Sequence, residues 1–416
     1  MTAPAPVADS ERSTPPQPTS TEPVRRGRVL ELDILRGFLL VWMTLTHLPT
    51  KASIVSNQTF GFVSGAEGFI FLAAFMIGRI EEGIEQTRGR AATIGDVARR
   101  TMKIYGYHCL LLAIAFTLVA AVGVSFHRQA LENLLSFYLQ SPRKAIVAAA
   151  LLKYRPSLLD ILPIYIIFLI WTPVARAVAR RWSWKPVLAV SIGVWVAAQF
   201  GLRGWMYQHG DPFGLSVPET STGAFDLYAW QLLWTSGLAL GSVFADRVSG
   251  VSPAGEEHPL QVPRWLLIAA FVVAACFVVL RYSPVDQWMS PDVYGRLIDK
   301  WHLGPARIVD FTAISIILIR FGAQIAKLPL LGELAPVGRA SIEVFSVHVL
   351  CCVGANALSH DADPMLPGWQ QVLVLGATMT ALFVTAKVAN SRAARRHATG
   401  ASSSTQMSLR LRKSSA

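Results

Sequence analysis

Apolar runs of about 20 residues recur along the chain, and short polar segments separate them. An α-helix needs a run of this length to cross the hydrocarbon core of a bilayer. The pattern therefore predicts an all-α, polytopic membrane protein with about ten transmembrane helices in one bundle. The predicted spans lie near residues 30–50, 59–79, 104–124, 158–178, 187–207, 228–246, 265–282, 306–325, 340–358 and 369–389.

The composition favours a chain that lies in lipid. Of its 416 residues, 52% are hydrophobic and only 15% are charged, and the mean hydropathy is +0.42. An average soluble domain has about 25% charged residues, so this chain has too little charge to cover a soluble surface. We expect the lipid bilayer to be its main surrounding.

The basic residues predict an orientation. The net charge is +12, and Lys and Arg gather in the segments 79–103 and 176–185, whereas the turn at 359–368 has two Asp and no Lys or Arg. The positive-inside rule then predicts an even number of spans with both termini in the cytoplasm. The segment 125–157 would lie outside, partly as an interfacial helix. This placement of charge argues against nucleic acid as a partner.

The two ends of the chain differ from the middle. Residues 1–27 are rich in Pro, Ser and Thr and contain no apolar run, which predicts a disordered cytoplasmic tail. Residues 392–416 are polar and basic and are predicted to form a second cytoplasmic tail. The intervening residues, 28–391, would form one transmembrane domain.

Several well-known motifs are missing from the sequence. It contains no Walker loop, GxGxxG turn, GxSxG elbow or HExxH helix. The four cysteines show no CxxC or Cys/His spacing of a zinc site. We therefore expect no metal and no tightly bound cofactor, and ATP-driven transport, hydride transfer and zinc hydrolysis lack support.

The first predicted span carries three ionisable side chains, although each would cost about 2.5–3.5 kcal/mol at mid-bilayer. Asp33 and Arg36 are three residues apart and are predicted to pair on one helical face. His47 follows eleven residues after Arg36 and returns to nearly the same face, near the outer end. Such a stripe suits a substrate path. The alternative is that Asp33 and Arg36 neutralise each other while His47 reaches the interface.

The second span places Glu67 among small residues near its outer end. A carboxylate beside a histidine can orient the imidazole and stabilise its protonated form, so Glu67 is a candidate partner of His47. The alternative is a carboxylate at a water-filled mouth without a catalytic part.

Four further polar residues are candidates for lining a substrate path. Asp160 opens the fourth span and could instead cap its helix. Gln231 could instead join packed helices. Arg307 stands at the outer start of the eighth span, and Asp310 follows it three residues later as a possible ion-pair partner. His348 is the second intramembrane histidine and could instead be a hydrogen-bonded packing residue.

An arginine, a histidine and a carboxylate in one bundle suit the transfer of an acyl group to a hydroxyl. The alternative of another class is a transporter or exporter of an anionic solute or glycan. The sequence shows neither the internal repeat nor the pair of broken helices that many transporters have.

The sequence resembles the OpgC family, membrane succinyltransferases that modify osmoregulated periplasmic glucans. The resemblance covers about residues 28–390, and the spacing of Arg36 and His47 is similar to the Arg-and-His motif of the wider transmembrane acyltransferase superfamily. Where the family tends to have a Ser-Gly pair, this chain has Ala73 and Ala74. The stretches that carry the resemblance are "LDILRGFLLVWMTLTHLP", "SGAEGFIFLAAFMIG", "LDILPIYIIFLIWTP", "WQLLWTSGLALG", "HLGPARIVDF" and "GRASIEVFSVHVL".

The resemblance implies ten spans in the bacterial inner membrane and an O-acyltransferase that moves succinyl from cytoplasmic succinyl-CoA, its donor substrate, to a periplasmic glucan. In this hypothesis His47 is the general base or a transient acyl carrier, and Glu67 orients it. Arg36, helped by Asp33, holds the pantetheine or phosphate part of the donor. Acetyl transfer to another envelope polysaccharide is the alternative within the same class. Secondary candidates for the path are Asp160, Gln231, Arg307 and His348.

Overall fold

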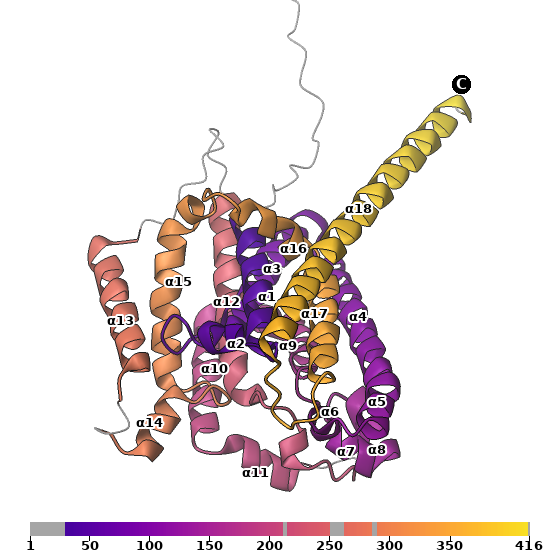
Figure 1. Ribbon diagram of the computed structural model, residues 1–416. Helices are drawn as coiled ribbons and strands as arrows, with labels where there is room; N and C mark the ends of the chain where they lie inside the picture. Colours follow the sequence, from indigo (N-terminus) through magenta and orange to yellow (C-terminus); the bar gives the residue numbers. More distant parts are fainter. Residues whose placement is uncertain (1–29, 211–213, 250–261, 285–288, 415–416) are drawn as a thin grey trace, which may run out of the picture.

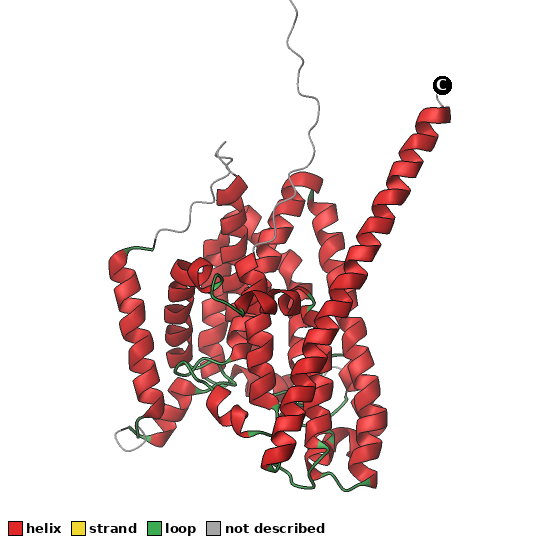
Figure 2. Cartoon of the chain, turned by 45° about the horizontal axis from the view of Figure 1, so that its top comes forward, coloured by secondary structure: helices red, strands yellow, loops and turns green. Residues whose placement is uncertain are grey.

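The computed structural model describes residues 30–210, 214–249, 262–284 and 289–414, and every regular element in these ranges is a helix (Figures 1 and 2). The predicted tail 1–27 lies outside the described residues. The all-α fold class is confirmed.

The centre of the bundle consists of long helices from distant parts of the chain (Figure 1). Helix α3 packs against α1 and α12, and α12 also packs against α9. These contacts join the first and middle thirds of the sequence around one core. The bounds are Leu30–His47 for α1, Gly65–Arg88 for α3, Ile161–Trp182 for α9 and Leu227–Ser249 for α12.

Other helices surround this centre. Helix α13 packs against α15 on one side of the bundle, and α17 packs against α18 on another (Figure 1). Short helices connect the long ones. The bounds are Lys51–Ser56 for α2, Arg90–Ile114 for α4, Trp184–Gln199 for α10, Leu202–His209 for α11, Arg264–Tyr282 for α13, Pro291–Ile298 for α14, Pro305–Ile325 for α15, Ala335–Arg339 for α16, Ser341–Asn356 for α17 and Gly368–Ser414 for α18.

Each of the ten predicted spans contains a helix. By length and composition, five helices could cross a membrane, or up to seven if each of two bent pairs forms one span. Helix α1 is not among the five, and it carries Glu31, Asp33 and Arg36 within its first two turns. The number of ten crossings therefore stays a prediction.

Two of the apolar segments are sharply bent. The predicted span 187–207 is wrong as a single helix, because α10 and α11 meet at an angle of 83°. The break falls at Gly201, whose φ of +88° is the left-handed conformation that glycine adopts without strain. A second bend of 96° separates the segment Leu331–Arg339 from α17. The expectation that the chain has no broken helices is thus also wrong.

The segment 125–157 forms three short helices at one end of the bundle (Figure 1). Phe137, Ala148 and Tyr154 are buried there against Leu112 of α4. The predicted interfacial helix is therefore several short helices with a small core of its own. The bounds are Gln129–Leu134 for α6, Ser136–Gln140 for α7 and Pro142–Ala150 for α8.

The contact between α3 and α12 depends on glycine. A Cβ atom added at Gly241 would overlap the backbone carbonyl group of Phe75, and one added at Gly78 would overlap the backbone of Leu238. The two helices therefore approach as closely as small residues permit, as in many helix pairs within membranes. This contact fixes the position of α3, and with it the site described below.

Replacing Gly241 by alanine is expected to lower the melting temperature of the detergent-solubilised protein. Overlap with a backbone in a packed interface costs about 1–3 kcal/mol, which exceeds the gain of up to about 1 kcal/mol from alanine's helix propensity. Gly193→Ala is the matched control, since nothing lies within 4 Å of a Cβ there. Equal melting temperatures for the two variants would contradict the close contact.

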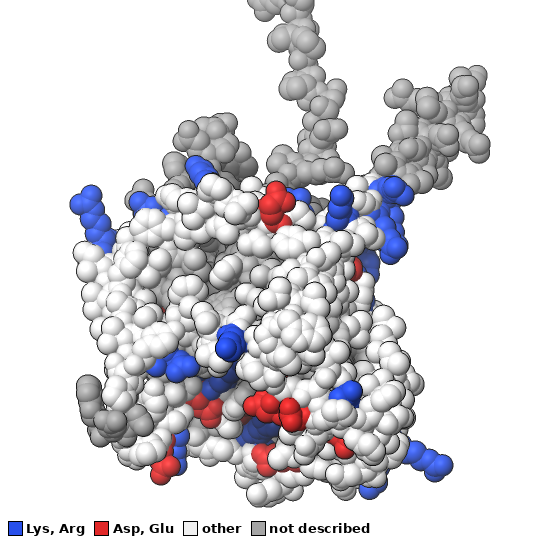
Figure 3. Space-filling view, viewed as in Figure 1, with Lys and Arg blue, Asp and Glu red and all other residues white. Residues whose placement is uncertain are grey.

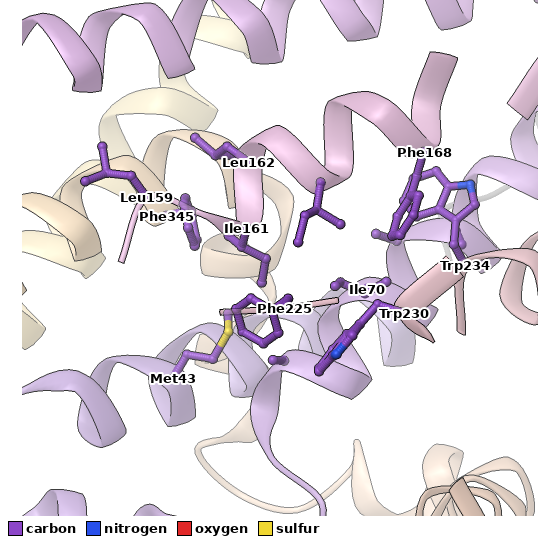
Figure 4. Close-up of a cluster of buried hydrophobic side chains, with 14 of the residues drawn as sticks. Met43, Ile70, Leu159, Ile161, Leu162, Phe168, Phe225, Trp230, Trp234 and Phe345 are labelled. Atoms are coloured by element: carbon purple, nitrogen blue, oxygen red, sulfur yellow. The ribbon is translucent and has the colours of Figure 1, made fainter. Parts of the chain in front are cut away.

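Large aromatic side chains lie among the aliphatic residues of the core (Figure 4). Trp230 and Trp234 of α12 are fully buried. The ring of Trp230 meets Phe225 edge-on at 4.6 Å between centroids, and Trp234 lies 5.5 Å from Phe168 of α9. Such pairs contribute about 0.5–1.5 kcal/mol beyond their burial. The second pair joins α9 to α12, and the first joins α12 to the segment that precedes it.

Charged side chains are unevenly distributed over the surface (Figure 3). They gather along the upper rim and in a mixed cluster in the lower half, and much of the remaining surface is uncharged. Helix α18 continues to Ser414 and extends beyond the bundle (Figure 1). Most of the predicted tail 392–416 is therefore part of this helix.

Candidate functional site

A cavity of about 200 Å³ lies where α1 ends, α3 begins and α17 passes. It is smaller than the pockets of about 300–1,000 Å³ that hold whole drug-sized ligands, so it suits the reacting end of a larger molecule. We call it the histidine cavity. Its lining residues are Met43, Thr46, His47, Ser64, Gly65, Ala66, Ser157, Leu158, Asp160, Ile161, Ala224, Phe225, Lys300, Trp301, Phe345 and His348.

The two predicted intramembrane histidines lie side by side in this cavity. The ring centroids of His47 and His348 are 5.5 Å apart, although the two residues lie 301 positions apart in sequence. The Nδ1 atom of His348 lies 3.5 Å from the thiol of Cys352, one turn along α17. The Nδ1 atom of His47 is buried, and no other side chain among the described residues binds it. The His47 imidazole is thus available for proton transfer with a ligand.

Two opposite charges also line the histidine cavity. Asp160 precedes α9, but its side chain makes no capping bond to that helix. Its Oδ2 atom accepts a hydrogen bond from the backbone N–H of Ala224 at 3.1 Å. The Lys300 ammonium lies 5.2 Å from the ring centroid of Trp301. Asp160 is therefore placed as a cavity residue, and Lys300 joins it there without having been singled out from the sequence.

Glu67 is fully buried, but its recorded bonds lead away from His47. The Nε atom of Arg307 donates to Oε1 of Glu67 at 2.8 Å, and Nη2 of Arg307 donates to the same oxygen. Ser64 donates from its backbone N–H to Oε2 of Glu67 at 3.0 Å. None of these hydrogen bonds joins Glu67 to His47, so the role of Glu67 in orienting His47 stays a prediction. Glu67 instead ties the start of α3 to α15.

Arg307 and Gln231 do not line the histidine cavity. Arg307 is completely buried beside Glu67. Gln231 donates to the carbonyl of Ser191 at 2.8 Å and accepts from its hydroxyl at 2.7 Å, so it joins α12 to α10. The packing alternative for Gln231 fits these bonds. Asp310, next to Arg307 on α15, accepts from the backbone N–H of Phe62 at 2.7 Å.

A second, basic pocket of about 160 Å³ lies around Arg36. Three cations line it, and Arg100 and Lys103 join Arg36 from α4. The sequence did not predict that these three cations would lie in one pocket, because their proximity depends on how α4 packs. The other lining residues are Phe69, Ile104, Leu162, Tyr165, Ser341, Ile342 and Phe345.

Asp33 and Arg36, which were predicted to pair with each other, each form a hydrogen bond that connects α1 to the region around α16 and α17. Arg36 donates from Nη2 to the hydroxyl of Ser341. Asp33 accepts from Nε of Arg339 at 3.2 Å. Lys103 is bound to Glu343 at 2.8 Å at the edge of the same pocket. Arg36 thus stands in a polar surrounding that an anionic ligand could enter.

Phe345 lines both the histidine cavity and the basic pocket. Its ring stacks on Phe69 of α3, with 6.2 Å between centroids, and lies 5.6 Å from His348. The two pockets are therefore neighbours that share an aromatic wall. A long, thin ligand could occupy both if this wall gave way.

The turn before α15 positions Lys300. Oδ1 of Asp299 accepts from the backbone N–H groups of Trp301 at 2.7 Å and His302 at 3.3 Å. Oδ2 of Asp299 is 2.7 Å from Nδ1 of His302. This hydrogen bond raises the pKa of His302 above its usual 6.5. Asp299 therefore fixes the backbone on both sides of Lys300.

The pair of Asp299 and His302 makes the stability of this turn depend on pH. A raised pKa in the folded state gives stabilisation that is complete below pH 6.5 and is lost as the pH rises through the folded value. The His302 side chain is 43% exposed, so the effect is below about 1 kcal/mol. We expect His302→Ala to lower the melting temperature more at pH 5.5 than at pH 8.5. An equal difference at both pH values would contradict this.

Comparison with known families identifies the family of the chain. The model of the family described as OpgC protein matches residues 28–394, nearly the whole chain. The chain belongs to the OpgC family. Comparisons with curated protein sequences and with solved structures found no match.

Membership of the OpgC family, together with the apolar helices, identifies a polytopic membrane protein of an acyltransferase type. The OpgC match includes both histidines, both pockets and the turn around Lys300. The departure at Ala73 and Ala74 lies in α3, where both are buried, and the Cβ of Ala74 faces Gly237 of α12. Neither residue lines the histidine cavity or the basic pocket.

Proposed function

We propose that this OpgC protein is an integral membrane O-acyltransferase that moves succinyl from cytoplasmic succinyl-CoA to hydroxyls of a periplasmic glucan. The observation that carries the proposal is the adjacency of the two pockets. A histidine pair lines one, three cations line the other, and both share Phe345. This arrangement suits a donor with an anionic body and a small reactive end.

In this proposal the basic pocket accepts the anionic part of the donor. Arg36, Arg100 and Lys103 offer donors for a phosphate or pyrophosphate, which would take the place of the carboxylates that now pair with Arg100 and Lys103. Both pockets are too small for an entire CoA molecule, so the nucleotide would remain outside the bundle. The thin pantetheine arm would pass Phe345 and bring the thioester to His47.

His47 would then act as the general base. It takes the proton of a glucan hydroxyl, and the oxygen attacks the thioester carbonyl carbon to form the new ester bond. The carbon–sulfur bond breaks, and the departing CoA thiolate receives the proton from His47. The product is a succinyl ester, which adds one negative charge to the glucan.

A specific observation supports a second candidate function, transport of an anionic solute or glycan. The two bent helix pairs, at 83° and 96°, are the kind of broken helices that form binding sites in many transporters. The cations around Arg36 could bind the anion. In this alternative no covalent bond changes.

Proteoliposomes separate the two functions. Purified protein is reconstituted with periplasmic glucan inside the vesicles, and succinyl-labelled succinyl-CoA is added outside. The proposal predicts label in the enclosed glucan and an equal amount of free CoA thiol outside. Movement of labelled glycan or solute across the membrane without acyl-CoA, and with no thiol release, would favour the transporter and overturn the proposal.

A further inference from the structure

We propose that Lys300 binds the free carboxylate of the acyl group, so that the histidine cavity selects dicarboxylic acyl donors such as succinyl over uncharged ones such as acetyl. This inference rests on the proposed function and assigns the donor class to the same site. It concerns a residue that the sequence motifs of the chain did not single out.

Lys300 is positioned to meet the acyl group of a donor whose thioester lies beside His47. It lines the same cavity as His47 and His348. Asp299 fixes the turn on both sides of it, and the rings of Trp301 and Phe225 lie 5.2 Å and 6.0 Å from its ammonium. Aromatic faces attract a cation without neutralising it. They hold the ammonium at the cavity and leave its hydrogen-bond donors for a ligand.

The charges nearby leave Lys300 without a fixed counter-ion. Within the described ranges, no carboxylate lies within 4.0 Å of its ammonium. Glu67 is bound by Arg307, and Asp160 accepts a backbone N–H from Ala224. A cation at a largely apolar cavity without a partner is costly, and a ligand carboxylate would supply that partner.

A succinyl group is short enough to lie wholly within the histidine cavity. Its two carbonyl carbons are separated by three carbon–carbon bonds, about 4 Å when extended. A thioester carbon beside His47 therefore has its carboxylate only a few ångströms away, within a cavity of about 200 Å³. An acetyl group ends at its methyl carbon and would leave the Lys300 ammonium unpaired. The lost charge-assisted hydrogen bond makes the uncharged donor the poorer substrate.

The test compares donors that differ in the carboxylate. For wild type, Lys300→Met and Lys300→Arg, kcat/KM is measured with succinyl-CoA and with butyryl-CoA, which has a similar length and no carboxylate. Lys300→Met is expected to lower the succinyl-to-butyryl ratio by about 10- to 100-fold, the range of a charge-assisted hydrogen bond. Lys300→Arg keeps the charge and should retain most of the preference. Lys144→Met, at an exposed lysine of α8, is the matched control.

Each outcome decides the matter. An unchanged ratio in Lys300→Met would overturn the assignment of Lys300 while leaving acyl transfer intact, and so would a wild type that prefers butyryl-CoA. Absence of transfer from every donor by folded wild-type protein would overturn the proposed function itself. If Lys300→Met fails to fold, the ratio in Lys300→Gln and inhibition of the wild type by free succinate, but not by butyrate, replace it as readout.

Discussion

Replacing His47 by alanine is expected to abolish acyl transfer and to leave a folded protein in the membrane. General base catalysis contributes about 10²- to 10⁴-fold to a rate, and the His47 imidazole lines the cavity with a buried Nδ1 atom that no other described side chain binds. The measurement is the rate of CoA thiol release with glucan present. His209→Ala, at an exposed histidine outside both pockets, is the control and should keep the wild-type rate. Full activity of His47→Ala would contradict the mechanism.

His348→Ala helps to interpret that result. His348 lies beside His47, but its Nδ1 atom contacts the thiol of Cys352 in the same helix. If His47 alone is the base, His348→Ala should reduce the rate less than His47→Ala does. An equal loss for both would show that the two rings act as one unit.

Replacing Arg307 by methionine is expected to destabilise the protein strongly. Arg307 and Glu67 are both completely buried, and removal of one partner leaves the other charge without compensation in the interior. Breaking such a pair costs about 3–5 kcal/mol. The measurement is the melting temperature in detergent. Arg99→Met is the matched control, because Arg99 pairs with Asp96 at the surface with its side chain 79% exposed, and such pairs contribute about 0–1 kcal/mol.

A double variant tests whether the pair itself is the cause. Glu67→Leu combined with Arg307→Met removes both charges, so the double variant should be more stable than either single variant. A Glu67→Gln variant with unchanged stability and a much lower rate would instead support the sequence-based prediction that Glu67 orients His47.

The sequence predicted the helices well because each apolar run had to be covered by lipid or by another helix. The ten predicted spans all contain a helix, and the two histidines that were chosen for their intramembrane position meet in one cavity. The break at Gly201 was missed. A glycine in the sequence can mark a turn. Here the apolar run continues through Gly201, and hydrophobic periodicity alone cannot detect the bend.

The partners of the polar residues could not be predicted in the same way. Glu67 was assigned to His47, but its guanidinium partner Arg307 lies 240 residues away, and only the packing of α15 brings the two together. For the same reason, the sequence did not decide whether Gln231 lines a substrate path or joins packed helices. Lys300 lies in a polar turn, where a lysine usually faces solvent. The fold of the turn around Asp299 places it at the cavity.

The most direct measurement of the central claim is donor label transfer by purified protein. The detergent-solubilised OpgC protein is incubated with periplasmic glucan and with labelled succinyl-CoA or labelled acetyl-CoA, and label in glucan is followed together with free thiol. We predict succinyl label in the glucan, matched by thiol release, and loss of both in His47→Ala. Absence of label and of thiol release with either donor, from protein that is folded by its melting curve, would contradict the claim that this protein is an acyltransferase of glucans.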